Sequence, residues 1–267
     1  MSVASTGSSR KRRCGVAEAL FWPALLGYGE AALAYSSARF SRLGTWGVRL
    51  GWLAQTALLA VQAARTDGFP WASWAGSLNL FVWLVVGAYL IWGCRPRYRV
   101  LGLSVMPLAV ALFAVARVGG GTGADERSHY GNLFLILHVG FVLAAFAGFT
   151  LAAALAGVYL WQDRRLRHRA ADILALRLPS LLTLEHLAGR TVAVSLPLLT
   201  FGLAAGFVRL GETGGRFDAM MGITVVTWLV YGGYLAARPR GRRGAHMLLA
   251  GFALVILVRL VLAGGHF

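Results

Sequence analysis

Two histidines in this chain have the side-chain type and the placement to bind a metal. His138 falls near one end of a long apolar segment, and His266 is the penultimate residue, directly after another such segment. Two imidazoles facing each other can hold a haem iron as its axial ligands. A structural interpretation stays open beside this one, in which His138 packs at a helix end and His266 belongs to a frayed terminus.

The elements that must position these histidines are long apolar segments. The chain is 58% hydrophobic and only 13% charged, whereas a soluble domain carries roughly 25% charged residues. At about 1.5 Å per residue, eight segments are long enough to cross about 30 Å of hydrocarbon. The sequence therefore predicts an all-α fold, a polytopic membrane helix bundle with about eight transmembrane helices, at residues 16–35, 47–64, 75–92, 100–117, 132–160, 191–209, 219–236 and 245–263.

Few other side chains offer chemistry. Glu30 and Arg259 fall inside predicted spans, where a charge is costly and is usually functional or paired, unless it snorkels to the interface. There is no HExxH motif and no Ser/His/Asp grouping that the topology would bring together, so the sequence indicates no side-chain catalyst. Small residues recur inside spans, as at Ala152–Ala154 and from Gly202 to Gly206, and predict close helix packing.

The positive charge is placed as in a membrane protein. The formal net charge is +16, but the arginines fall in short clusters between apolar segments, which argues against a nucleic-acid partner and for contact with a lipid bilayer. Alternate loops 36–46, 93–99, 162–190 and 237–244, with Arg49, hold sixteen arginines, and the other three internal loops hold five. The arginine-rich loops, including 162–190, are predicted to be cytoplasmic, which places His138 and His266 on the outer face of a bacterial cytoplasmic membrane.

Several ordered fragments resemble one family. They are Phe69-Pro70, Ser77-Leu78 and Trp83; Leu137-His138-Val139; Pro179-Ser180-Leu181, Leu184 and Arg190; and Asp218, Thr227-Trp228, Tyr234, Arg238 and Gly244. In this order they resemble the cytochrome c assembly family, the CcsA-like and HemX-like haem-handling membrane proteins of system II. The resemblance divides the chain into a disordered basic N-terminal tail (1–15), two first transmembrane helices (16–64) and a six-helix cytochrome c assembly-like domain (65–267).

The resemblance implies a haem site on the outer face. In such proteins two external histidines act as axial ligands to haem b, and His138 and His266 match them by position. Arg216 and Asp218 would line the mouth of the site, where a cation could pair a haem propionate, and Trp228 and Arg259 complete the predicted cofactor-binding set. The resemblance also implies a ResB/CcsB-like membrane partner and apocytochrome c as the acceptor of the haem.

Two alternatives stay open, and a departure from the family pattern motivates the first of them. The family has a tryptophan-rich segment ending in Trp-Trp-Asp, whereas residues 211–218 read GETGGRFD, which favours a HemX-like or divergent member. The leading hypothesis is a haem-binding, haem-handling protein of cytochrome c biogenesis. The first alternative is a HemX-like regulator of haem biosynthesis that no longer carries haem and uses loop 162–190 as its contact surface. The second is a small-solute or ion transporter.

Overall fold

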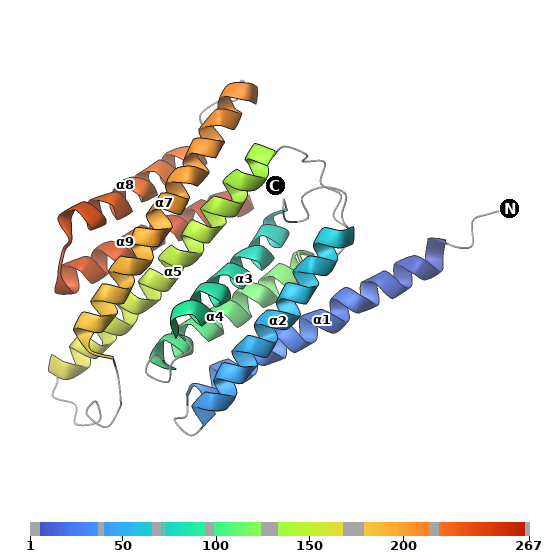
Figure 1. The fold of residues 1–267 in the computed structure, drawn as a ribbon, viewed down its shortest axis with the longest axis horizontal. Coiled ribbons are helices and arrows are strands. Elements are labelled where there is room, and N and C mark those ends of the chain that lie inside the picture. The colour runs from blue at the N-terminus through green and yellow to red at the C-terminus, as the bar shows by residue number, and fades with distance from the viewer. Residues whose placement is uncertain are drawn as a thin grey trace. The chain divides into compact units, whose positions relative to one another are not determined.

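In a computed structural model, the described part of the chain forms eight α-helices and contains no strand (Figure 1). The structure describes residues 6–36, 40–65, 71, 73–93, 99–123, 133–167, 179–213 and 219–264, without the side chains of 6–18, 41, 65, 92–93, 99–100, 133–135, 209, 212–213 and 258–264. The helices are α1 (Thr6–Ala34), α2 (Ser41–Arg65), α3 (Trp74–Gly93), α4 (Arg99–Val118), α5 (Leu133–Arg167), α7 (Leu181–Thr213), α8 (Ala219–Ala237) and α9 (Gly241–Gly264).

Five of these helices are long and apolar enough to cross a membrane. Their spans are Trp74–Ile91, Leu101–Val118, Ile136–Arg167, Leu181–Val208 and Ala219–Ala237. A span of 18 residues covers about 27 Å at about 1.5 Å per residue, close to the thickness of the hydrocarbon layer. The chain is therefore a multi-pass helical membrane protein, and the crossing of the membrane by α1, α2 and α9 stays a prediction.

Each predicted span falls within a helix, to within one residue at its ends, but several helices are longer than their predicted spans. α1 begins at Thr6, ten residues before its predicted span. The larger difference concerns loop 162–190, because α5 continues to Arg167 and α7 begins at Leu181. Ser180 explains the early start of α7, since its Oγ accepts the Thr183 amide hydrogen at 3.2 Å and so caps the helix. The prediction of a continuous loop over 162–190 was wrong for these helical residues.

The chain divides into two compact units. Unit 1 comprises Met1–Cys94 and Gly102–Gly131, and so contains α1 to α3 and most of α4. Unit 2 comprises Arg95–Leu101 and Asn132–Phe267, and contains α5, α7, α8 and α9. The division into three domains at 1–15, 16–64 and 65–267 was based on composition and on the family resemblance, and it stays a prediction.

In unit 1, glycines bring α1 and α2 into backbone contact. A Cβ atom added at Gly27 would lie 2.7 Å from the Gly47 carbonyl oxygen and 2.9 Å from the Gly51 Cα. Only a residue without a side chain fits there, as is usual where membrane helices approach closely. The buried ring of Tyr28 lies next to this contact and packs edge-on against Phe113 of α4.

A row of buried amide side chains also crosses unit 1. The Tyr28 hydroxyl donates to Gln55 Oε1 at 2.6 Å, and Gln55 Nε2 donates to Asn79 Oδ1 at 2.9 Å. Asn79 Nδ2 then donates to Gln62 Oε1 at 3.2 Å, and Gln62 Nε2 donates to the Gly121 carbonyl oxygen at 3.1 Å. Gln55, Gln62 and Asn79 are at most 1% exposed. Because each buried amide has partners, the row joins α1, α2, α3 and the turn after α4 without a large desolvation cost.

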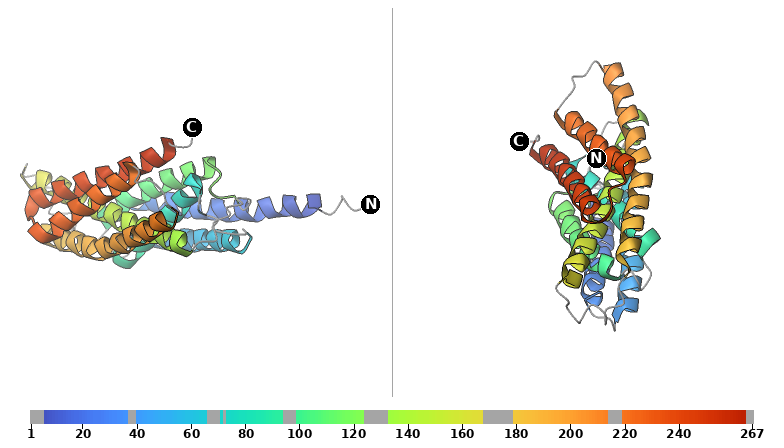
Figure 2. Two further views of the ribbon diagram at one scale, coloured as in Figure 1. Left: turned by 90° about the horizontal axis from the view of Figure 1, so that it is seen from above. Right: turned by 90° about the vertical axis from the view of Figure 1, so that its left-hand side faces the viewer.

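Unit 2 is a bundle of four helices in two antiparallel pairs. Figures 1 and 2 show α5 beside α7 and α8 beside α9, and these two pairs have the most extensive contacts within the unit. The centre of the unit is aromatic: the rings of Phe149 on α5 and Tyr231 on α8 stack with centroids 3.7 Å apart and an interplanar angle of 4°. Tyr231 is fully buried, so this stack joins the two pairs inside the core.

Candidate functional site

The histidine singled out by the sequence lies at the interface of α5 and α7. His138 is half-buried in the second turn of α5, and its Nδ1 atom lies 2.7 Å from the Gly202 carbonyl oxygen of α7. A carbonyl oxygen can only accept, so Nδ1 must carry the proton and donate it. With the proton on Nδ1, Nε2 is the ring nitrogen left to ligate a metal.

Two glycines make room for this imidazole. A Cβ atom added at Gly206 would lie 2.7 Å from His138 Nδ1 and 2.8 Å from its Cε1. One turn earlier, a Cβ atom at Gly202 would lie 2.7 Å from Val142 Cγ2. Positions four apart share one face of a helix, so Gly202 and Gly206 form a notch in α7 that holds the start of α5. The sequence prediction of close packing from Gly202 to Gly206 is confirmed.

The hydrogen bond and the notch together fix the imidazole. Histidines that ligate metals almost always donate their second ring nitrogen to a carbonyl or carboxylate, which sets the tautomer and the ring orientation. His138 has this arrangement within the protein, with the Gly202 carbonyl as the acceptor. The arrangement therefore suits the chemistry of an axial ligand to a haem iron, with Nε2 as the ligand atom.

Trp228 lies on the other side of α7. Its Nε1 atom donates to Thr200 Oγ1 at 2.9 Å, and Thr200 in turn donates to the Leu196 carbonyl oxygen. At about 100° per residue, Thr200 and Gly202 project from nearly opposite faces of α7. The hydrogen bonds of Trp228 and His138 thus reach opposite faces of one helix, and these contacts do not bring the two predicted site residues together.

The other predicted site residues fall outside the described parts. Arg216, Asp218 and His266 lie outside the described residues, and Arg259 belongs to α9 but its side chain is not among those described. The backbone does define the direction of α9. A Cβ atom at Gly244 would lie 3.6 Å from the Tyr234 ring, and one at Gly251 would lie 2.7 Å from the Tyr231 ring. Since 244 pairs with 234 and 251 with 231, α9 is antiparallel to α8.

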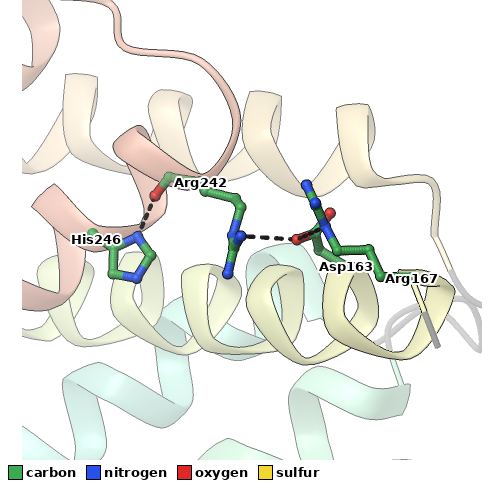
Figure 3. Close-up of polar contacts among 4 residues, drawn as sticks. All are labelled: Asp163, Arg167, Arg242 and His246. Carbon is green, nitrogen blue, oxygen red and sulfur yellow. Dashed lines mark hydrogen bonds and ion pairs between the residues drawn. The ribbon is translucent and has the colours of Figure 1, made fainter.

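The opposite ends of these helices are joined by charged groups. Asp163 at the end of α5 accepts from Arg167 at 3.2 Å and pairs with Arg242 at the start of α9 at 3.4 Å (Figure 3). His246 Nδ1 donates to the Arg242 carbonyl oxygen at 2.6 Å. Glu185 of α7 accepts the Gly241 amide hydrogen at 3.3 Å, at the first residue of α9. These contacts fix the start of α9 against α5 and α7.

Sequence reasoning missed two features that position side chains. The amide row in unit 1 was not predicted, although a glutamine or asparagine inside an apolar segment is a readable sign of an internal hydrogen bond. Thr200 was also missed as the partner of Trp228. Among the described side chains, no group of three or more His, Cys, Asp or Glu residues is arranged to hold a metal ion, so a metal would depend on isolated ligands such as His138.

Comparison with known proteins identifies the family of the chain. A family model described as Cytochrome C assembly protein matches residues 71–264, which contain all the helices from α3 to α9. The chain is 25% identical to "Cytochrome c biogenesis protein CcsA" of Microcystis aeruginosa, over 80% of this chain and 82% of the relative. The protein of the same name from Gloeothece citriformis is 26% identical over the same shares, and that from Synechococcus elongatus is 25% identical over 89% of both chains. No solved structure matches.

Proposed function

Since the chain belongs to the cytochrome c assembly protein family, we propose that it serves cytochrome c biogenesis by binding haem through His138. The family match covers most of the chain, and the CcsA relatives align along nearly their whole length. The family and its relatives support a role in cytochrome c biogenesis. The binding of haem, the identity of its ligands and the assignment to the system II pathway are our proposal.

The observation that carries the proposal is the fixed orientation of the His138 imidazole. Its Nδ1–H donates to the Gly202 carbonyl oxygen, and the notch at Gly206 accommodates the ring. The carbonyl oxygen at 2.7 Å and the glycine whose Cβ would collide with the ring together hold the imidazole in one orientation. These two features favour the ligand interpretation over the packing interpretation, because they orient the imidazole before any ligand binds.

The remaining residues complete the proposed site by position. When bound, haem would supply an iron that accepts imidazole nitrogens and a macrocycle that carries two propionates. His138 would bind the iron through Nε2, and His266 is proposed as a second ligand. Arg216 and Asp218 are proposed at the mouth of the site, where the guanidinium would pair a propionate. The expected acceptor is an apocytochrome c, with a ResB/CcsB-like protein as membrane partner.

An absorption spectrum tests the proposal directly. The purified protein in detergent would be supplied with haem and measured before and after reduction with dithionite, for the wild type, His138→Ala and His266→Ala. His246→Ala is the matched control, because His246 also donates Nδ1–H to a helix carbonyl but lies at the start of α9. We expect the reduced haem signal to weaken in the first two variants and to persist in the control.

Two results would overturn the proposal. A wild-type protein that stays colourless after haem is supplied would show that this member of the family does not bind haem. An unchanged spectrum and haem content in His138→Ala would show that the imidazole is not a ligand. Restoration of the signal in His138→Ala by free imidazole would support ligation, because the added base replaces the missing ligand atom without restoring the packing of the side chain.

A further inference from the structure

Unit 2 contains a large groove away from the proposed haem site. It has a volume of about 760 Å³ and lies between α7 and α8, at the end where α8 turns into α9. Three arginines line it: Arg190 from α7, and Arg238 and Arg240 from the turn between α8 and α9. All three are exposed, and none of them forms an ion pair among the described residues.

The acidic side chain in the groove does not neutralise this charge. Glu185 also lines it, but the Glu185 carboxylate accepts the Gly241 amide hydrogen at the start of α9. One carboxylate against three guanidinium groups leaves the groove positively charged. Guanidinium groups bind phosphate oxygens in a bidentate manner, which suits an anionic ligand that carries phosphate.

One of these arginines, Arg238, has a strained backbone conformation in the turn. Arg238 has φ of +43°, in the left-handed region, directly after the last residue of α8, and its amide donates to the Tyr234 carbonyl oxygen at 3.0 Å. Glycine is the residue that normally occupies this position at a helix end. An arginine there projects a guanidinium into the groove from a position where a glycine would cap the helix with less strain.

The groove continues into an apolar hollow within the membrane-spanning part of α7. This second hollow, of about 300 Å³, shares Ala193 and Leu235 with the groove and is lined further by Leu196, Pro197 and Phe201. Both lie along the span Leu181–Val208. From Arg190 to Thr200, at the far end of the hollow, α7 rises about 15 Å, half the thickness of about 30 Å that hydrocarbon has in a bilayer.

We propose that this surface, the α7–α8 groove, binds one anionic phospholipid. The phosphate contacts Arg190, Arg238 and Arg240, and an acyl chain lies along the apolar hollow. A positively charged end joined to an apolar channel one leaflet deep matches the shape and charge of a lipid of the surrounding membrane. A free phosphate would use only the charged end, and a zwitterionic lipid would leave the groove's positive charge uncompensated.

Native mass spectrometry of the full-length protein tests the assignment. The protein would be purified in detergent and mixed with equal amounts of phosphatidylglycerol and phosphatidylcholine. We expect the wild type to retain phosphatidylglycerol in preference. The triple variant Arg190→Gln, Arg238→Gln, Arg240→Gln should lose that preference by about tenfold or more, since each basic residue near a bilayer adds appreciably to the binding of anionic lipid. The matched control changes the exposed Arg164, Arg165 and Arg243, outside the groove, to Gln.

Two further variants separate binding from folding. Arg238→Gly removes one guanidinium but suits the positive φ, so it should fold at least as stably as the wild type while retaining less phosphatidylglycerol. Ala193→Trp fills the junction of the two hollows and should reduce lipid retention with the arginines intact. Equal retention of both lipids by the wild type, or an unchanged preference in the triple variant, would overturn the proposal. Displacement of the lipid by millimolar inorganic phosphate would also overturn it, in favour of a phosphate site.

Discussion

Replacement of Gly206 by alanine should weaken haem binding without touching any ligand atom. The new methyl group would lie 2.7 Å from His138 Nδ1 and 2.8 Å from Cε1, both well inside van der Waals contact. Either the imidazole or α7 must move, and the hydrogen bond of 2.7 Å to the Gly202 carbonyl oxygen is the contact that breaks. The perturbation therefore acts on the orientation and the tautomer of the proposed ligand alone.

The magnitude follows from the two roles of that hydrogen bond. As a contribution to stability, a net hydrogen bond is worth about 1 kcal/mol, and the alanine gains about 0.5–1 kcal/mol by its helix propensity. The melting temperature should therefore change little. As the contact that orients a ligand, its loss typically costs about 10–100-fold in affinity, which corresponds to about 1.4–2.7 kcal/mol of binding free energy. Haem affinity should fall much more than stability.

Haem titration and thermal unfolding in the same detergent distinguish the two effects. Gly233→Ala is the matched control, because Gly233 is an exposed glycine inside helix α8 and its Cβ would meet no atom within 4 Å. We expect Gly233→Ala to bind haem as the wild type does. Equal haem affinity in Gly206→Ala and Gly233→Ala, measured where His138→Ala has lost binding, would refute the role of the carbonyl contact in orienting the imidazole.

Three further predictions concern the fold. Gln55→Leu leaves the buried Tyr28 hydroxyl without its acceptor and should destabilise the protein by about 2 kcal/mol or more; an unchanged melting temperature would contradict this. Tyr231→Leu removes the stack on Phe149 and should cost about 2–4 kcal/mol, whereas Tyr231→Phe should cost less than about 1 kcal/mol, and similar melting curves for both would argue against the stack. Ser180→Ala should cost about 1 kcal/mol and speed hydrogen exchange in the first turn of α7, and Ser180→Asp should restore protection.

The fold was predictable because it is determined mainly by the length of the apolar segments, which can be read directly from the sequence. A run of apolar residues long enough to cross a bilayer must satisfy its backbone internally, so each run becomes a helix. The start of α7 was not predictable in this way. Residues 181–190 include Glu185, His186 and Arg190, whose polarity suggests a loop, but the Ser180 cap and the pairing with α5 extend the helix through them.

Of the candidate site, the sequence predicted only the residue type of the ligand, a histidine. The position of His138 near a helix end could be read from the sequence, but its partner, the Gly202 carbonyl, is a backbone atom 64 residues away and leaves no residue-type signal. The packing of Trp228 was not predictable either. Its indole nitrogen donates to Thr200, on the face of α7 away from His138, and its contact with a cofactor, suggested by the family pattern, stays a prediction. The pattern of apolar residues does not indicate which face of α7 packs against which neighbouring helix.

The amide row in unit 1 also differs in its chemistry from a proton relay. A continuous line of hydrogen bonds through apolar helices would be a path for proton conduction if its members could take up and release protons, as aspartate, glutamate and histidine do in proton relays. Gln55, Asn79 and Gln62 are carboxamides, which donate and accept hydrogen bonds but do not titrate. The row therefore joins the helices through uncharged groups, and its three carboxamides offer no titrating site at which a proton could be held.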